Sequence, residues 1–229
     1  MVDMLSRCLR GCALLMAAVL LAACSRVIIG TTRAAEAGGE RPPVPIAQLL
    51  IEPHRFPPQY RAAVLDDSAV DHALQDIDGV PTGSVVTPVE CTPPVRWHSE
   101  SVGVEGINNV DGAGTSRLIV LVTRPVPPLA TRLDQLRGCP TFDVGSGEDV
   151  STVNVTMLPA PPVDADDAYA VEQAVTSPGS ERTTLTFAAQ VGDTRVSATW
   201  LPDPATDEVD TSSLDVVFRD AVVKLRREG

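Results

Sequence analysis

One stretch constrains the fold more than any other: residues 183–200 read TTLTFAAQVGDTRVSATW. A two-residue Gly192-Asp193 loop is typical of a tight hairpin and pairs Val191 with Thr194. A one-residue slip would move every apolar side chain to the opposite face, so the hydrophobic pattern tests this register. Counting outward sets apolar residues opposite one another on one face: Ala189 with Val196, Phe187 with Ala198, and Leu185 with Trp200. The pattern predicts an antiparallel hairpin whose other face carries Thr186, Gln190, Arg195 and Thr199.

Two more strands and three helices are predicted by periodicity. Residues 117–124 (RLIVLVTR) are apolar on both faces, which is typical of a central strand, and residues 151–158 (STVNVTML) alternate. We expect helices at 68–77, 128–138 and 212–227, because each carries its apolar residues on one face. Ser68 is the expected cap of the first helix and Gly79 its stop.

These elements predict an α+β fold, with a mainly antiparallel sheet, helices packed on one of its faces, and one disulfide. Residues 159–181 are rich in proline and acidic side chains, and we interpret them as a long loop or a short helix. The expected organisation is a single α+β extracytoplasmic domain over residues 46–229.

The amino-terminal segment is typical of a secretory signal. Arg7 and Arg10 precede an apolar run, and small residues follow it. Arg10 and Arg26 bracket only 15 residues, whereas a membrane-spanning helix needs about 20 apolar residues. We therefore predict a signal peptide at residues 1–23 rather than a membrane span.

The end of this signal, Leu21-Ala22-Ala23-Cys24, resembles the lipobox of bacterial lipoproteins. The resemblance implies cleavage before Cys24 and lipidation of its thiol, with palmitate or a similar acyl chain. Two or more acyl chains give stable membrane anchoring where one does not. The predicted location is therefore the extracytoplasmic face of the cell membrane. Residues 24–45 are small and polar, which indicates a flexible tether.

Cys91 and Cys139 are the two cysteines that remain after Cys8 and Cys12 leave with the signal and Cys24 carries lipid. Disulfides persist outside the cytoplasm, so this pair predicts one bridge. Metal ligation by the pair is the alternative, but the chain has no CxxC motif and no histidine at ligand spacing.

Catalytic and nucleotide-binding motifs are absent from the sequence: it has no GxSxG elbow, P-loop, dinucleotide-binding fingerprint or HExxH. We therefore expect no enzyme, no cofactor and no metal. A net charge of −12 argues against nucleic-acid binding, which depends on attraction to phosphates.

Three weaker candidates for chemistry have simpler interpretations. Residues 76–79 (DIDG) resemble part of a calcium loop but lack its later ligands, so a helix end explains them better. The acidic group Asp164, Asp166 and Asp167 is a candidate cation site, although solvated acidic loops are commoner. His98 lies near Glu100 and Glu105 as a candidate general base, and a surface histidine is the simpler interpretation.

The chain resembles small mycobacterial and other actinobacterial lipoproteins of unknown function. The lipobox carries this likeness, together with RFPPQYRAAVL (55–65), DIDGVPTG (76–83), ECTPP and RGCPTF. More distantly, its layout is similar to the extracellular sensor domains of mycobacterial serine/threonine kinases. Those domains carry two disulfides rather than one. The resemblance to them implies a cleft that receives an unidentified ligand.

The function expected of an anchored, tethered domain without a catalytic motif is that of a non-enzymatic, sensor-like module that binds a small ligand or an envelope protein. Two alternatives remain open at this point. One is an envelope hydrolase that uses acidic residues, and the other is a lipid carrier with an apolar cavity of several hundred Å3, as in ordinary ligand pockets.

Overall fold

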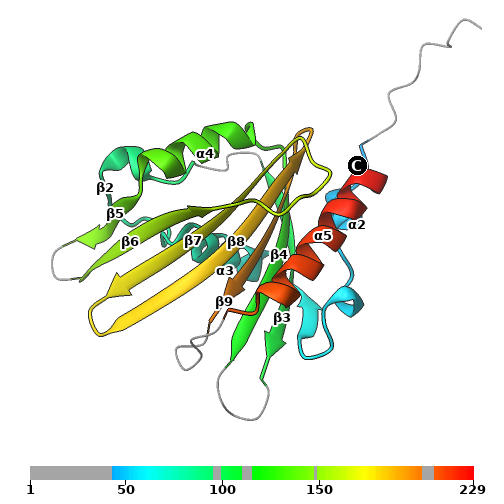
Figure 1. Cartoon of the computed structure of the whole chain (residues 1–229), viewed down its shortest axis with the longest axis horizontal. Helices are drawn as coiled ribbons and strands as arrows, with labels where there is room; N and C mark the ends of the chain where they lie inside the picture. The colour runs from blue at the N-terminus through cyan, green and yellow to red at the C-terminus, as the bar shows by residue number, and fades with distance from the viewer. Residues whose placement is uncertain (1–42, 95–98, 110–114, 147–148, 203–208) are drawn as a thin grey trace, which may run out of the picture. The chain divides into compact units, whose positions relative to one another are not determined.

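A nine-stranded antiparallel sheet organises the computed structural model (Figure 1). The structure describes residues 43–94, 99–109, 115–146, 149–202 and 209–229. The strand order is β1-β3-β4-β9-β8-β7-β6-β5-β2, and each neighbouring pair is antiparallel. The strands are β1 (Arg61–Val64), β2 (Val86–Thr87), β3 (Glu100–Asn108), β4 (Ser116–Arg124), β5 (Thr141–Ser146), β6 (Asp149–Leu158), β7 (Asp167–Ser177), β8 (Ser180–Val191) and β9 (Thr194–Leu201). The predicted antiparallel α+β class is confirmed.

Helices cover both faces of this sheet, whereas the sequence predicted helices on one face only. The α-helices are α2 (Ile46–Leu49), α3 (Asp67–Asp78), α4 (Leu129–Gly138) and α5 (Thr211–Glu228), and the short 3-10 turns are η2 (Pro53–Arg55) and η3 (Val89–Cys91). Helices α2 and α5 pack on one face, while α3 and α4 pack on the other (Figure 1). The prediction failed here because the central strands are buried on both sides, and each side needs its own cover.

The larger core lies under α5. Its apolar stripe, which includes Leu214, Phe218 and Leu225, packs against alternate residues of β4, β8 and β9. Phe187 of β8 meets Phe218 edge to face, with ring centroids 5.6 Å apart. These buried side chains hold the central strands in one register.

The predicted hairpin is confirmed residue by residue. β8 and β9 pair Val191 with Thr194 and continue with the three apolar pairs expected from the sequence, Ala189–Val196, Phe187–Ala198 and Leu185–Trp200. Gly192 takes a positive φ of 58°, the conformation that this tight loop requires. The apolar members face α5, so the polar members face α3 and α4.

The main error of the sequence prediction is at residues 159–181, where β7 lies instead of a loop or short helix. β7 occupies an inner position between β6 and β8, and Ser177 pairs with Ser180 across a Pro178-Gly179 turn. Gly179 has a φ of 80°, which is why this turn can be so tight. Glu172 and Gln173 interrupt the apolar pattern of β7, so the pattern did not predict a strand there.

Helix α3 begins slightly earlier than predicted, and its cap is Asp66 rather than Ser68. The Asp66 Oδ1 atom accepts the Ala69 backbone N–H at 2.9 Å, and Ser68 Oγ donates to the same oxygen. Gly79 ends the helix in the left-handed conformation, as predicted. Helix α4 buries the three leucines that predicted it, Leu129, Leu133 and Leu136.

The chain crosses the sheet twice between β1 and β3. It leaves β1 at one edge, passes through α3, and reaches β2 at the opposite edge. It then returns to pair β3 with β1. α3 packs on the same face as α4, but against β4 and β9, whereas α4 packs against β5, β6, β7 and β8.

Candidate functional site

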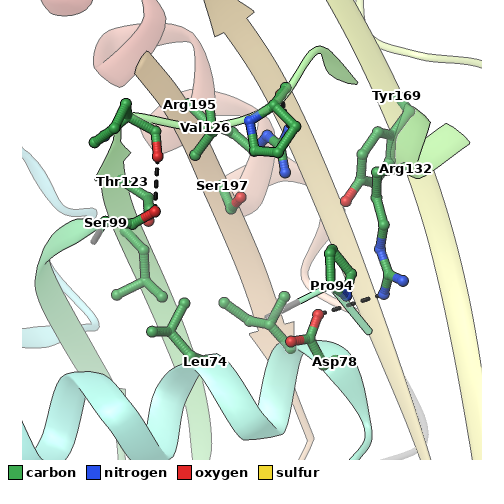
Figure 2. Close-up of a pocket in the computed structure, with 14 residues that line it drawn as sticks. Leu74, Asp78, Pro94, Ser99, Thr123, Val126, Arg132, Tyr169, Arg195 and Ser197 are labelled. Atoms are coloured by element: carbon green, nitrogen blue, oxygen red, sulfur yellow. Dashed lines mark hydrogen bonds and ion pairs between the residues drawn. The ribbon is translucent and has the colours of Figure 1, made fainter. Parts of the chain in front are cut away.

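A pocket of about 330 Å3 lies between α3 and α4, with the central strands as its floor. Figure 2 shows Leu74 and Asp78 on α3 at one side and Arg132 reaching toward Asp78 from α4. Ser197 of β9 lies near the middle of the floor, and Arg195 lies at the far end. The pocket is the best candidate for a binding site because its lining brings together five separate parts of the chain.

Strand register explains the polar floor. Leu121 of β4 pairs with Ser197 of β9, and Thr123 pairs with Arg195, so these four side chains share the face toward α3. Opposite residues of antiparallel strands project to the same side, and residues two apart along a strand do the same. Ser197 in turn pairs with Ala188 of β8, next to Tyr169 of β7. The floor therefore joins two hydroxyl groups, a phenol and a guanidinium across four neighbouring strands.

Two walls of the pocket are joined by a buried ion pair. The Arg132 Nη2 atom of α4 lies 3.3 Å from Asp78 Oδ1 of α3, and their side chains are 10% and 9% exposed. Arg132 also donates through Nη1 to Gln135. The Asp78 carbonyl accepts a hydrogen bond from Gln173 Nε2 of β7 at 3.4 Å. These contacts tie both helices to each other and to the sheet.

The rim near Arg195 is made of prolines held by polar side chains. Ser99 Oγ donates to the Pro125 carbonyl at 2.7 Å, and Arg195 Nη2 donates to the Pro127 carbonyl at 2.9 Å. Proline lacks a backbone donor, but its carbonyl remains a good acceptor. The loop between β4 and α4 is therefore fixed to β9.

The predicted Cys91–Cys139 disulfide is present, with the sulfur atoms 2.06 Å apart. It joins η3 to the residue that follows α4. Gln135 Nε2 reinforces this link, donating to the carbonyls of Glu90 at 2.9 Å and Thr92 at 2.6 Å. Since Pro94 and Arg132 both line the pocket, the bridge fixes two of its walls close to each other.

A second cavity, of about 550 Å3, lies on another side of α3 and contains His72 and Asp76. Asp76 is engaged by two arginines, with Arg117 Nη2 at 2.8 Å and Arg182 Nη1 at 3.5 Å. Arg117 continues to Glu105 at 3.2 Å. This network connects α3 to β3, β4 and β8, and we interpret its carboxylates as structural.

The weaker sequence candidates that the structure describes are engaged in ion pairs and hydrogen bonds, and Asp164 and Asp166 both pair with Arg226. Asp76 and Asp78 bind different arginines, so the resemblance to a calcium loop has a structural explanation. Asp166 accepts the Gly192 N–H at 2.7 Å and pairs with Arg226 at 2.8 Å. His98 and the predicted lipidation site Cys24 lie outside the described residues. Within the described ranges, the structure has no group of three or more histidine, cysteine or acidic side chains placed to hold a metal.

Sequence reasoning missed the pocket, although part of its floor was visible. Arg195 falls on the polar face of the predicted hairpin, and Ser197 is two residues further along the same face. Polar side chains are uncommon on the covered face of a central strand unless they have hydrogen-bond partners or bind a ligand. The polar face of this hairpin was therefore the sequence signal for the pocket. Recognising it required knowing that β4 and β7 lie on either side of the hairpin.

A separate polar cluster lies at the start of α5. Tyr60 Oη donates to Asp210 Oδ2 at 3.1 Å, and Asp210 Oδ1 accepts the Ser213 N–H at 2.9 Å. Burial raises the pKa of Tyr60 to about 12. Burial also acts to raise the pKa of Asp210, but hydrogen bonds from Ser213, Tyr60 and Gln59 outweigh it and lower that pKa. This cluster caps α5 and fixes it to the loop before β1.

Helices long and apolar enough to cross a membrane do not occur in the part of the chain that the structure describes.

Comparison with known proteins finds similarity only at the level of solved structures. No protein-family model matches the chain, and no curated protein matches it. A crystal structure of an uncharacterized protein from Mycobacterium smegmatis is similar with 14% identity and a TM-score of 0.49, covering 81% of this chain and 98% of that one. The extracellular domain of PknH from Mycobacterium tuberculosis is similar with 12% identity and a TM-score of 0.46, covering 78% and 98% respectively. These two neighbours are a mycobacterial uncharacterized protein and a mycobacterial extracellular domain, the two kinds of protein that the sequence resembles.

Proposed function

We propose that this chain is a cell-envelope lipoprotein whose domain binds a small ligand or an envelope protein without catalysing a reaction. The pocket between α3 and α4 is the proposed binding site, and it is the observation that carries the proposal. Its polar floor lies on buried central strands, where apolar packing would otherwise be expected. In this proposal Cys24 holds the protein on the extracytoplasmic face of the cell membrane, and the pocket senses what is present there.

The pocket offers less support for a hydrolase than for a binding module. Hydrolysis by acidic residues commonly uses two carboxyl groups that flank the scissile bond. Among the described lining residues Asp78 is the one carboxylate, and it is bound to Arg132. The pocket therefore supplies positioning groups rather than a pair of acid and base.

A lipid carrier fits the pocket less well too. Acyl chains require walls that are apolar along most of their length. Here Arg132, Arg195 and Ser197 face the cavity together with Leu74 and Leu121. Such a mixed lining suits a compact ligand with both polar and apolar parts.

Membrane anchoring is tested by a Cys24→Ser variant expressed in an actinobacterial host. We expect the variant to leave the membrane fraction or to accumulate unprocessed, because the anchor is covalent. A Cys12→Ser variant is the matched control, since it makes the same change inside the predicted signal. An unchanged membrane fraction for Cys24→Ser would refute the anchor.

Ligand binding is tested with the mature protein and a Ser197→Leu variant, which fills the floor of the pocket. Thermal unfolding is measured with and without small molecules extracted from the envelope of the host. We expect the extract to raise the melting temperature of the unmodified protein but not that of Ser197→Leu. The control Ser212→Leu makes the same change at an exposed position of α5 and should retain the response. Equal responses from all three proteins would show that the pocket is not the site.

A further inference from the structure

We propose that the pocket between α3 and α4 selects a compact anionic ligand, whose carboxylate or phosphate group binds beside Arg195 and Ser197. This inference rests on the proposed binding function, and it adds the chemical class of the ligand. The anionic group faces the polar end of the floor, and an apolar portion of the ligand packs toward α3.

The charge of the pocket is opposite to that of the whole chain. The described lining residues include two guanidinium groups, those of Arg132 and Arg195, and one carboxylate, that of Asp78. The protein as a whole carries a net charge of −12. A locally positive cavity in an acidic protein concentrates anions, because walls of low dielectric focus the field into the opening. Asp78 is bound to Arg132, and the second guanidinium group of the described lining, that of Arg195, lies at the other end of the floor (Figure 2).

The strand geometry places two suitable donors within reach of one anion. Arg195 and Ser197 are two residues apart on β9 and share the face toward the pocket. Residues at this spacing lie about 6.7 Å apart along a strand, a gap that one carboxylate or phosphate group can bridge. Arg195 Nη2 already donates to the Pro127 carbonyl at 2.9 Å and to Gln190 Oε1 at 3.3 Å. A guanidinium carries five N–H groups, so Arg195 can keep these contacts and also donate to a ligand. A serine hydroxyl supplies a further donor to the same anion.

The opposite side of the pocket is apolar and limits the size of the ligand. Leu74 and Ile77 of α3 face the cavity, and Leu121 contributes to its floor. The volume of about 330 Å3 is near the lower end of the range of ligand pockets, about 300–1,000 Å3. The pocket therefore fits a short apolar group attached to the anion and is too small for a long acyl chain.

The inference is tested with hexyl phosphate, hexanoate and the neutral analogue hexanol, titrated into the mature protein by calorimetry. We expect one or both anions to bind at least about tenfold more tightly than hexanol, because a charge-assisted hydrogen bond in a partly buried site contributes that much. The two anionic probes distinguish a preference for phosphate from one for carboxylate. Increasing salt should weaken the anions and leave hexanol unchanged.

Variants separate the charge preference from binding as such. Arg195→Gln should remove most of the preference for the anions, and Arg195→Lys, which keeps the charge, should restore part of it. Arg137→Gln is the control, because this arginine of α4 is exposed and pairs with Asp134 away from the pocket. Ser197→Leu should abolish binding of all three probes.

Each possible negative result of these titrations leads to a different conclusion. Equal affinity for hexanol and the anions, lost in Ser197→Leu, would overturn the anion preference and leave the proposed function standing. Anion binding that Arg195→Gln leaves unchanged would overturn the assignment of Arg195. No binding of any probe, charged or neutral, would overturn both the inference and the pocket as a binding site for small molecules.

Discussion

Arg132 of α4 and Asp78 of α3 form an ion pair that is nine-tenths buried, with Nη2 and Oδ1 3.3 Å apart. Three strands and η3 separate the two helices in the chain, and the pair joins them across the sheet face that carries the pocket. A second arginine on the same helix, Arg137, pairs with Asp134 at 3.4 Å on the exposed side. Helix α4 thus contributes one arginine to a buried ion pair and another to an exposed ion pair.

The first prediction uses these two pairs. Arg132→Gln should lower the free energy of unfolding by about 3 kcal/mol, because it leaves a carboxylate buried without its partner. Arg137→Gln should change it by less than about 0.5 kcal/mol, because exposed pairs contribute little. Urea denaturation of both variants measures the difference. Equal effects would show that burial of the Arg132 pair has no energetic consequence.

The double variant Asp78→Leu/Arg132→Leu extends this test. Replacing both charges with apolar side chains should recover most of the stability lost in Arg132→Gln, since buried pairs offset much of their own desolvation cost. If the double variant is less stable than Arg132→Gln, the ion pair stabilises the fold by more than the cost of its desolvation.

The second prediction concerns the disulfide. Reducing Cys91–Cys139, or replacing both cysteines with alanine, should destabilise the domain by about 4 kcal/mol, because the bridge closes a long loop in the unfolded chain. Binding should weaken as well, since the bridge fixes the walls that carry Pro94 and Arg132. Thermal unfolding with and without reductant measures the first effect. A melting temperature insensitive to reductant, with thiol labelling complete, would contradict the prediction.

The third prediction concerns acid stability at Asp210. Its pKa is lower in the folded protein than in the unfolded chain, because hydrogen bonds to the carboxylate outweigh its burial. Its contribution to stability is therefore complete above the unfolded pKa of about 3.9 and is lost as the pH falls through the lower folded pKa. Asp210→Asn keeps a capping side chain but removes the titration.

Denaturation at a series of pH values below about 5 compares Asp210→Asn with the unmodified protein. The unmodified protein should lose stability more steeply on acidification, so that the two curves converge at low pH. Parallel curves would show that Asp210 does not contribute to acid sensitivity.

The fourth prediction concerns Tyr60, whose pKa burial raises to about 12. The chain has two tyrosines, so the difference in tyrosinate absorbance between the unmodified protein and Tyr60→Phe reports this residue alone. We expect the difference to titrate near the raised value rather than near the ordinary value of about 10. The linked stability is complete below the unfolded pKa and is lost as the pH rises through the folded pKa. A midpoint near the ordinary value would show that Tyr60 is accessible to solvent.

The hairpin at 183–200 was predictable because two independent signals agreed. The loop Gly192-Asp193 fixes the register, and the apolar pattern of β8 and β9 confirms it. The three longer helices were predictable for a similar reason, since each has an apolar stripe and a clear stop or start. Local chemistry determined these elements.

β7 was not predictable in the same way, because its stability comes from its neighbours. Gln173 is 2% exposed and donates to a carbonyl of α3, so a polar residue of the strand is buried with a distant partner. Local patterns cannot reveal such a partner. The pocket could not be predicted for the same reason. Ser197 and Arg195 form part of a pocket floor only when β4 lies beside β9 and α3 covers both strands.

The double crossing between β1 and β3 has a consequence for the order of folding. The β8–β9 hairpin closes a short loop, whereas α3 and β2 depend on contacts with residues far along the chain. Loops that are long must lose more chain entropy before their contacts form, so such parts tend to form late. The pocket is assembled from these late parts, and we therefore expect ligand binding to appear last during refolding. Occupancy of the pocket would then report a fully folded domain rather than a partly folded one.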